Sequence, residues 1–284
     1  METVGEVDAL RRCVANWRGQ GERVGFVPTM GNLHDGHLVL VARARALCER
    51  VVASVFVNPL QFGPGEDYAA YPRTPEDDRR ALRQAGTDLL FLPGVDVMYP
   101  CGPAAATRIE VPALSAMLEG ASRPGHFTGV ATVVGKLFNM VQPDVAVFGE
   151  KDYQQLLVVR RLAADLCWPV DVVGVETVRE PDGLALSSRN QYLTATERAR
   201  APLLYRVLQE VGSQLRGGSH DYDVLESKAV AALTQGGFVP EYVSVRRAAD
   251  LGLPAGGASE RLVVLGAARL GRARLIDNIS VSMA

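Results

Sequence analysis

Short runs of apolar and β-branched residues recur along the first 180 residues, with helix-like patterns between them. The runs are VGFVPT at 24–29, VVASVFV at 51–57, DLLFLP at 88–93, DVAVFG at 144–149 and VDVVGVET at 170–177. Strands that are apolar on both faces and separated by helices are typical of a parallel sheet covered on both sides. The pattern therefore predicts an α/β fold, with a Rossmann-like doubly wound parallel sheet over residues 1–177.

The pattern changes after residue 177. Longer amphipathic helices are predicted around 195–236, and three apolar runs at 241–248, 261–270 and 273–281 predict strands. The segment PAGGASE at 254–260 is expected to be a loop between strands rather than a linker. Residues 178–284 are therefore predicted to form a smaller C-terminal α+β domain, which we expect to act as a lid.

Several helix boundaries can be predicted directly. Thr74 is expected at an N-cap, with Pro75 at the first helical position, and TATE at 194–197 has the spacing of a capping box. Pro202 is predicted to kink or restart a helix. The stretch 126–141 is mostly apolar and predicts a buried helix.

The segment PTMGNLHDGH, directly after the first predicted strand, carries the clearest chemical signal. Ligands of doubly wound sheets bind beyond the carboxyl ends of the strands. Gly31 and Gly36 permit close approach of the backbone, and a helix beginning near Asp35 would direct N–H groups and a positive dipole end toward an anion. His34 and His37 can then point to the same side and donate to phosphoryl oxygens. The segment predicts a phosphate site.

Two other interpretations of His34 and His37 stay open. Histidines three residues apart can form half of a zinc site, although neither a nearby cysteine nor a third histidine completes it in the sequence. Either histidine can instead cap the helix or be a hydrogen-bonded core residue. Their position among two glycines after a strand favours the phosphate site.

Composition narrows the possible functions. The 284 residues are 48% hydrophobic and 22% charged with a net charge of −2, as in an ordinary globular protein. Acidic and basic residues are interspersed and provide no broad positive field, so we expect no nucleic-acid partner. The amino-terminal stretch has an early acid and no apolar core, and no run approaches the ~18 apolar residues of a membrane span. We expect a cytoplasmic protein without a membrane partner.

Other nucleotide-binding signatures are absent from the sequence. No G-x-G-x-x-G follows a predicted strand, and GVATVVGKL at 129–137 lacks both the glycine spacing of a P-loop and a Ser or Thr after Lys136. Lys136 is therefore interpreted as a helix lysine. The cysteines form no C-x-x-C pair, and we interpret them as reduced, buried thiols. They are Cys13, Cys48, Cys101 and Cys167.

The segment PTMGNLHDGH resembles the signature of the HIGH-type nucleotidyltransferase superfamily, and as a whole string it resembles the pantothenate synthetases, also called pantoate-beta-alanine ligases. Further strings agree with that family in order. They are FVNPLQFGPGEDYAAYPRTPEDD at 56–78, RPGHFTGV at 123–130, FGEKDYQQL at 148–156 and DGLALSSRNQYL at 182–193, with weaker agreement for YVSVRRAADL and ARLIDNIS. The resemblance covers nearly the whole chain.

The resemblance implies an AMP-forming ligase that makes a C–N bond. Members are similar in condensing (R)-pantoate with beta-alanine in two steps, through a pantoyl adenylate, with release of pyrophosphate and then AMP. Magnesium accompanies the ATP, and members resemble one another in being homodimers. The first step develops negative charge on phosphate oxygens, so it should depend on positioned cations and N–H donors.

The resemblance also implies site residues. His34 and His37 would hold the ATP phosphates, with His37 as proton donor, and Lys151 would supply a cation for the α-phosphate or the leaving group. The implied catalytic set is His37, His34, Lys151, Ser187, Ser188 and Arg189, the last three forming an equivalent of the KMSKS loop. The implied ATP-binding set is Met30, Gly31, His34, His37, Gly149, Lys151, Asp152, Val178, Leu186, Ser187, Ser188 and Arg189. The implied substrate-binding set is Gln61, Gln155, Pro28, Met30, Arg123 and His126, with Phe62 as a further apolar wall.

Alternative functions remain open at this point. Another adenylate-forming or nucleotidyl-transferring enzyme of the superfamily would use a different acceptor, but the glutamines of NPLQFG and KDYQQ argue against it. A non-catalytic ATP-binding protein would not need Lys151 and the Ser-Ser-Arg segment together. Asp77 and Asp78 either assist hydrated magnesium or complement a helix dipole, so no metal ligand is assigned.

Overall fold

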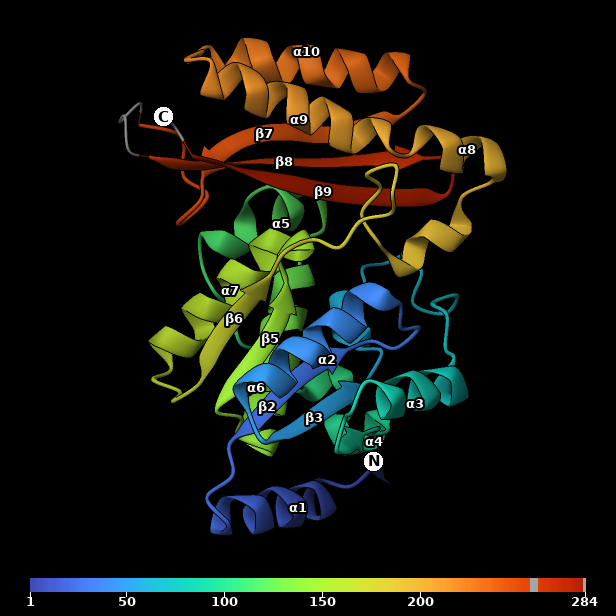
Figure 1. The fold of residues 1–284 in the computed structure, drawn as a ribbon, viewed down its shortest axis with the longest axis vertical. Helices are drawn as coiled ribbons and strands as arrows, with labels where there is room; N and C mark the ends of the chain where they lie inside the picture. Colours follow the sequence, from blue (N-terminus) through green and yellow to red (C-terminus); the bar gives the residue numbers. More distant parts are fainter. Residues whose placement is uncertain (256–259, 283–284) are drawn as a thin grey trace. The chain divides into compact units, whose positions relative to one another are not determined.

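The computed structural model describes residues 1–255 and 260–282, in which the chain divides into two units (Figure 1). The first unit comprises Met1–Glu150 and Gln155–Glu176, and the second comprises Lys151–Gln154 and Thr177–Ala284. The four residues Lys151–Gln154 thus group with the second unit, although the residues on both sides of them group with the first. The role of residues 178–284 as a lid stays a prediction.

The apolar runs of the first unit form a parallel sheet, which confirms the predicted fold class. In the described residues the strand order is β1-β4-β3-β2-β5-β6, and all neighbours are parallel. The chain runs from β2 outward through β3 to β4, and then resumes at β5 on the other side of β2. The β2/β5 boundary is therefore the switch point of a doubly wound sheet. The strands are β1 Glu2–Val4, β2 Val24–Thr29, β3 Arg50–Val55, β4 Leu89–Phe91, β5 Val145–Gly149 and β6 Asp171–Val175.

Helices cover both faces of this sheet, because neighbouring strand residues point to opposite sides. Phe26 and Phe91 face a core shared with α1, α6 and α7, whereas Val27 and Ala53 face a second core shared with α2 and α3. The α-helices are α1 Val7–Gly19, α2 Asp35–Leu47, α3 Pro75–Gln84, α4 Val95–Met98, α5 Glu119–Ser122, α6 His126–Val141 and α7 Tyr153–Asp165. The 3-10 turns are η1 Pro59–Gln61, η2 Pro103–Ala105, η3 Leu114–Ala116 and η4 Glu150–Asp152.

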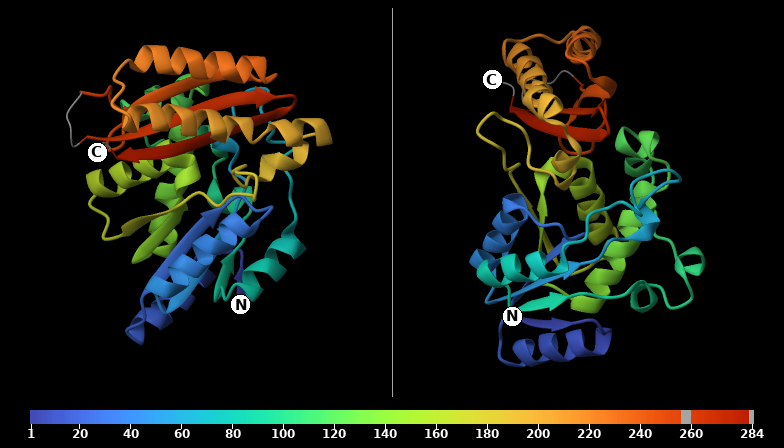
Figure 2. Two further views of the ribbon diagram at one scale, coloured as in Figure 1. Left: turned by 45° about the horizontal axis from the view of Figure 1, so that its top comes forward. Right: turned by 90° about the vertical axis from the view of Figure 1, so that its right-hand side faces the viewer.

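The second unit is an antiparallel sheet with two long helices on one face (Figure 2). Its described strands lie in the order β7-β8-β9, and Glu241 of β7 forms an ion pair with Arg274 of β9 at 2.7 Å. The predicted capping box at Thr194 is present, and the helix restarts after Pro202 as predicted. The elements are η5 Ser188–Tyr192, α8 Ala195–Arg200, α9 Leu203–Arg216, α10 Tyr222–Gln235, β7 Val239–Arg247, β8 Arg261–Leu270 and β9 Ala273–Ser282.

Two expectations need correction or restriction. All four cysteines are free, but only Cys48 is buried; Cys101 and Cys167 are exposed, so the expectation of buried thiols was wrong for these two. Residue 167 follows α7 in a turn with a φ of 53°, which takes its side chain out of the helix packing. The predicted loop at 254–260 lies partly outside the described residues.

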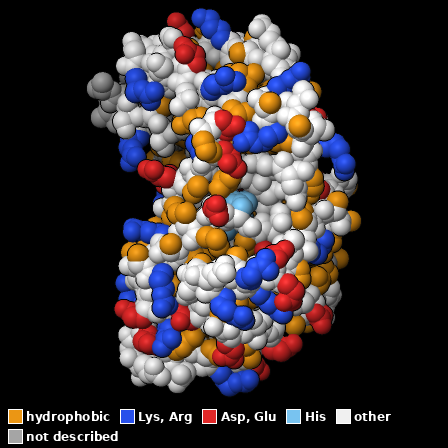
Figure 3. Space-filling view, turned by 45° about the vertical axis from the view of Figure 1, so that its right-hand side comes forward, with side chains coloured by type: hydrophobic (Ala, Val, Ile, Leu, Met, Phe, Trp, Pro, Cys, Tyr) orange, Lys and Arg blue, Asp and Glu red, His pale blue; other side chains and the backbone are white. Residues whose placement is uncertain are grey.

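The charge pattern of the surface agrees with the small net charge. On the face drawn in Figure 3, Lys and Arg side chains alternate with Asp and Glu side chains among the described residues. Opposite charges also meet on one helix, as in Arg80 with Asp77 and Arg161 with Asp165. Among the described residues, no helix has the length and apolar content that crossing a membrane requires.

A glycine in α6 allows the turn η1 to pack directly against the helix backbone. A Cβ atom built at Gly129 would overlap the carbonyl group of Leu60. The Gly129 carbonyl oxygen also accepts a hydrogen bond of 3.1 Å from Asn58 Nδ2. The backbone of the predicted RPGHFTGV motif therefore fixes the position of the turn that carries Gln61.

We expect Gly129→Ala to destabilise the protein by about 1–3 kcal/mol, because the new methyl group meets backbone atoms that cannot rotate away. Alanine at an unconstrained helix position would instead stabilise by about 0.5–1 kcal/mol. Gly135→Ala is the control in the same helix, because its Cβ would meet the end of the Ile109 side chain, which can move. Urea unfolding of both variants measures the difference, and equal stabilities would contradict the close approach at Gly129.

Candidate active site

His34 and His37 come together at the start of α2. Their ring centroids are 4.1 Å apart, which confirms that the two side chains can share one side. His34 occupies the N-cap position, and its backbone N–H donates to His37 Nδ1 at 3.3 Å. Because Nδ1 accepts in this contact, a neutral His37 ring carries its proton on Nε2. The capping interpretation is therefore correct for both histidines, because the His34 side chain also accepts from the helix backbone in a reciprocal capping box.

A zinc site at this histidine pair receives no support. Among the described residues, no group of three or more His, Cys, Asp or Glu side chains is arranged to hold a metal ion. Two imidazoles alone fall short of the four ligands of a structural zinc site and the three protein ligands of a catalytic one.

The loop before His34 is held by a buried carboxylate. Asp78 accepts hydrogen bonds from the Asn32 and Leu33 amides at 3.0 and 2.8 Å, and its side chain also accepts from Thr74 Oγ1 at 3.2 Å. Asp78 is only 3% exposed. The amides of Asn32 and Leu33 therefore bind a protein group, and the prediction of a phosphate site rests on the helix start that follows them.

Gly31 is required where this loop meets Asp78. Its φ is +79°, and a Cβ built there would lie 2.8 Å from Asp78 Oδ2 and 2.9 Å from Val55 Cγ1. Asn32 has a φ of 51°, in the left-handed region that asparagine tolerates better than most residues. The glycine of this tight loop was predicted correctly from the sequence, whereas the carboxylate around which the loop closes was not predicted.

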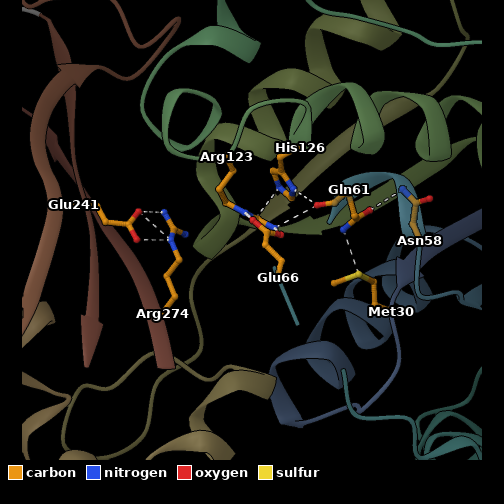
Figure 4. A network of polar contacts seen from close by, with 8 residues as sticks. All are labelled: Met30, Asn58, Gln61, Glu66, Arg123, His126, Glu241 and Arg274. Carbon is orange, nitrogen blue, oxygen red and sulfur yellow. Dashed lines mark hydrogen bonds and ion pairs between the residues drawn. The ribbon is translucent and has the colours of Figure 1, made fainter. Parts of the chain in front are cut away.

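Gln61 and Met30, two predicted substrate-binding residues, are in contact (Figure 4). Gln61 Nε2 donates to Met30 Sδ at 3.2 Å, and Gln61 Oε1 accepts from Asn58 Nδ2 at 3.1 Å. Asn58 Oδ1 in turn accepts from the Tyr99 hydroxyl at 2.7 Å. This buried chain of amides fixes the orientation of the Gln61 amide. Asn58 belongs to the NPLQFG string, yet no residue pattern distinguished it from a turn asparagine.

Arg123 and His126 also gather at Gln61, on its backbone side (Figure 4). Arg123 binds Glu66 through two nitrogens, at 2.8 and 2.6 Å, and its Nη1 lies 3.2 Å from His126 Nε2. His126 Nδ1 lies 2.8 Å from the Gln61 carbonyl oxygen. The guanidinium of Arg123 lowers the pKa of Glu66 to about 2 against the effect of burial. The role of Arg123 and His126 in substrate binding stays a prediction.

A cavity opens where three strands of the first unit end. It has a volume of about 280 Å³, and its lining includes Met30 after β2, Phe56 and Val57 after β3, and Leu92 after β4. Asp78 also lines it. The position agrees with the expectation that a ligand binds beyond the carboxyl ends of the strands.

Lys151 and the Ser-Ser-Arg segment both belong to the second unit. Lys151 lies in η4 with its ammonium 3.9 Å from Asp152 Oδ2, and its side chain is 18% exposed. Ser187 caps η5 by accepting from the Arg189 amide at 3.3 Å. Lys151 and Ser187 line a common cavity of about 10 Å³, which has room for roughly one water molecule.

The remaining predicted site residues lie at strand ends or in the second unit's connecting segment. Pro28 is in β2, Gly149 ends β5, and Gln155 lies in the first turn of α7. Val178 and Leu186 pair through a backbone hydrogen bond of 2.9 Å, and Ser188 begins η5. All of these residues, and Phe62 beside Gln61, are half-buried. Their roles stay predictions.

We expect the stability of the protein to fall as the pH drops from 6.5 to 4. Burial, and next the charge of Arg123, lower the pKa of His126 from 6.5 to about 4. The unfolded chain therefore binds a proton in this range that the folded chain does not, at a cost of at most about 3 kcal/mol. Urea unfolding at several pH values measures the slope. The slope of the unfolding free energy against pH should flatten in His126→Gln. It should persist in the control His220→Gln, because His220 is exposed. Equal slopes in the two variants would show that His126 is not the cause.

We expect Asp78→Asn to destabilise the protein by about 1–3 kcal/mol, since one loop amide then faces an N–H group instead of an oxygen. Asp77→Asn is a matched control on the same helical turn. Asp77 is 65% exposed and pairs with Arg80, so its change should stay within about 0.5 kcal/mol. Thermal or urea unfolding compares the two, and similar losses would show that the loop does not depend on Asp78.

Comparisons with known proteins agree with one another. Residues 2–280 match the family model described as pantoate-beta-alanine ligase. A pantothenate synthetase of Alkalilimnicola ehrlichii is 58% identical over 96% of this chain and 96% of its own, and one of Pseudomonas putida is 56% identical over 100% and 98%. A crystal structure of pantothenate synthetase from Thermus thermophilus has a TM-score of 0.86 and 53% identity, covering 98% of this chain and 99% of its own.

A more distant structure was solved with ligands. Pantoate-beta-alanine ligase from Francisella tularensis, complexed with beta-gamma ATP and beta-alanine, has a TM-score of 0.81 and 32% identity. It covers 98% of this chain and 97% of its own. The matched range, residues 2–280, thus extends over both units. The chain belongs to the pantoate-beta-alanine ligase family.

Proposed function

We propose that this protein joins (R)-pantoate to beta-alanine at the expense of ATP, through a pantoyl adenylate. The observation that carries the proposal is the full-length family match, from residue 2 to 280, over a chain in which His34 and His37 meet at the start of α2. In the first step a pantoate carboxylate oxygen attacks the α-phosphorus of ATP, and the bond to the β-phosphate breaks. In the second step the beta-alanine amine attacks the acyl carbon, the bond to AMP breaks, and the amine loses a proton.

In the first step, negative charge grows on the phosphate oxygens and on the leaving pyrophosphate. His37 is proposed to donate from Nε2–H to a phosphate oxygen, because its Nδ1 is engaged by the His34 amide. His34 and the first turn of α2 add donors and the positive end of the helix dipole. Met30, Gly31 and Gly149 are proposed to form the neighbouring backbone of the ATP site.

Lys151 and the Ser-Ser-Arg segment are proposed to supply the remaining positive charge. The ammonium group of Lys151 would bind the α-phosphate or the leaving pyrophosphate, and Arg189 would bind the β- and γ-phosphates as a forked donor with Ser187 and Ser188. Asp152 would accept from the ribose hydroxyls; it is 47% exposed and therefore accessible to a ligand. Val178 and Leu186 would pack against the adenine.

Pantoate carries two hydroxyls and a gem-dimethyl group, so it needs amide partners beside apolar walls. Gln61 and Gln155 are proposed to bind the hydroxyls. Met30 supports this placement, because it contacts Gln61 and also lines the 280 Å³ cavity. Pro28 and Phe62 would extend the apolar wall. Arg123 and His126 are proposed to act at the same site by holding the Gln61 backbone.

Magnesium is proposed to enter with ATP as part of the substrate. The described residues provide no cluster of three or more His, Cys, Asp or Glu side chains for a resident metal. Asp78 is occupied by loop amides and Asp77 by Arg80, so neither has the free carboxylate geometry of a dedicated site. Magnesium commonly keeps waters and binds through substrate phosphates. A homodimer and a cytoplasmic location complete the proposal.

The test is pantoate-dependent exchange of labelled pyrophosphate into ATP, with magnesium present and beta-alanine absent. We expect exchange by the wild type and a fall of roughly 10²–10³ in kcat for His37→Ala and Lys151→Ala, as for other groups that stabilise transition-state charge. Lys228→Ala, at an exposed position of α10, is the control for loss of a lysine. Absence of exchange with pantoate, despite ATP binding, would overturn the proposed function and favour another carboxylate substrate.

A further inference from the structure

The string ARLIDNIS has no assigned chemistry, yet two of its residues contact both reactive segments of the second unit. Asp277 and Asn278 lie next to each other in β9, and both are buried, at 4% and 7% exposure. Successive strand residues point to opposite faces. Asp277 shares its face with Leu275 and Ile279, which pack in the core with α9 and α10, so Asn278 points to the other face.

Asn278 holds the backbone of Lys151. Its side-chain Nδ2 donates to the Lys151 carbonyl oxygen at 3.0 Å, across 127 positions of sequence. The same segment is held a second time, because the Tyr153 hydroxyl donates to the Ala248 carbonyl oxygen at 2.9 Å. Both bonds join Lys151–Gln154 to residues of the second unit, whereas β5 and most of α7 belong to the first.

Asp277 holds the segment that leads to Ser187. It binds Arg179 through both oxygens, at 2.6 and 2.8 Å, with 17% of the arginine and 3% of the aspartate side chain exposed. The guanidinium also stacks on Tyr205 of α9, with its carbon 3.6 Å from the ring centroid. One face and both terminal nitrogens of the guanidinium are thus in use, which makes Arg179 a structural cation rather than a phosphate ligand.

Arg179 fixes a short hairpin whose end is the Ser-Ser-Arg segment. It forms a β-bridge with Ala185, and its Nη1 donates to the Gly183 carbonyl oxygen at 3.1 Å. The Leu186 amide donates to the Val178 carbonyl oxygen at 2.9 Å, directly before Ser187. Asn190 closes the other side by donating from Nδ2 to the Ala185 carbonyl oxygen at 3.0 Å.

We propose that Asp277 and Asn278 are a pair of positioning residues that hold Lys151 and the Ser187–Arg189 loop in a fixed arrangement relative to each other. Neither touches a reacting atom. Asn278 acts through the Lys151 backbone, and Asp277 acts through Arg179 and the hairpin. Lys151 and Ser187 then keep their mutual arrangement because two adjacent residues of one strand bind both segments. The inference rests on the proposed function, because Lys151 and the Ser187–Arg189 loop need a fixed arrangement only if both act on ATP.

The kinetic test measures the two half-reactions separately. Asn278→Ala should lower kcat of pantoate-dependent pyrophosphate exchange by roughly tenfold to a hundredfold, as expected for a displacement of about 1 Å at a reacting group. Asn278→Asp keeps the size of the side chain but places an oxygen against the Lys151 carbonyl, so its loss should be at least as large. The KM for pantoate, and the reaction of beta-alanine with supplied pantoyl adenylate, should change by less than about twofold.

A double-mutant cycle shows whether Asn278 acts through Lys151. If it does, Asn278→Ala should have little further effect on exchange in a Lys151→Ala background, because the group it positions is already absent. Full additivity would overturn the inference. Ser280→Ala, at an exposed position of the same strand, is the control and should leave exchange unchanged.

Hydrogen exchange gives a readout that does not depend on activity. Asn278→Ala and the milder Tyr153→Phe should each increase amide exchange of residues 151–154, with the rest of β9 unchanged. If the wild-type protein shows no pyrophosphate exchange, the proposed function is refuted. Amide hydrogen exchange would still decide whether the pair holds residues 151–154. Unchanged amide exchange and unchanged kcat in the Asn278 variants would refute the inference itself.

Discussion

A buried carboxylate that binds two backbone amides shapes the loop on which the histidine pair depends. Asp78 reaches from the first turn of α3 to Asn32 and Leu33, so the loop between β2 and α2 is closed from outside its own sequence. The carboxylate accepts from the amides and from Thr74, which satisfies both oxygens without a cationic partner among these contacts. His34 can then take the N-cap position, and His37 can follow one turn later with a fixed ring orientation.

Two further carboxylates also hold a segment of the chain, here with an arginine as the partner. Glu66 holds Arg123 against the Gln61 backbone, and Asp277 holds Arg179 in the hairpin before Ser187. In both cases the carboxylate binds two nitrogens of one arginine and thereby restrains a segment of the chain. Breaking one partner of such a pair leaves an uncompensated buried charge, which costs more than the pair contributes. Asp78 and Asp277, two of the least exposed acids among the described residues, thus hold neighbouring segments of the chain in place.

Much of the architecture follows from local patterns in the sequence. The apolar runs predicted five strands of the parallel sheet within a few residues, and the run at 126–141 has the bounds of α6. β1 could not be predicted, because Glu2–Val4 is a three-residue edge strand whose only pairing is with β4. Its formation depends on a neighbour 87 residues away, and three residues show no periodicity.

In the candidate site, some residues could be predicted from the sequence and others could not. Residue types after the first strand predicted His34 and His37 as a phosphate site, and the family resemblance added Lys151, because these side chains have chemistry of their own. The residues that hold the loop before His34, the Arg123 side chain and the Lys151 backbone could not be predicted. They are Asp78, Glu66 and Asn278, which act across 45, 57 and 127 positions of sequence. Asp77 and Asp78 make the point most directly. The two are adjacent and chemically identical, yet one pairs with Arg80 at the surface and the other closes the loop before His34. Only the direction in which the helix turns separates them, and that direction is set by packing in the core beneath α3.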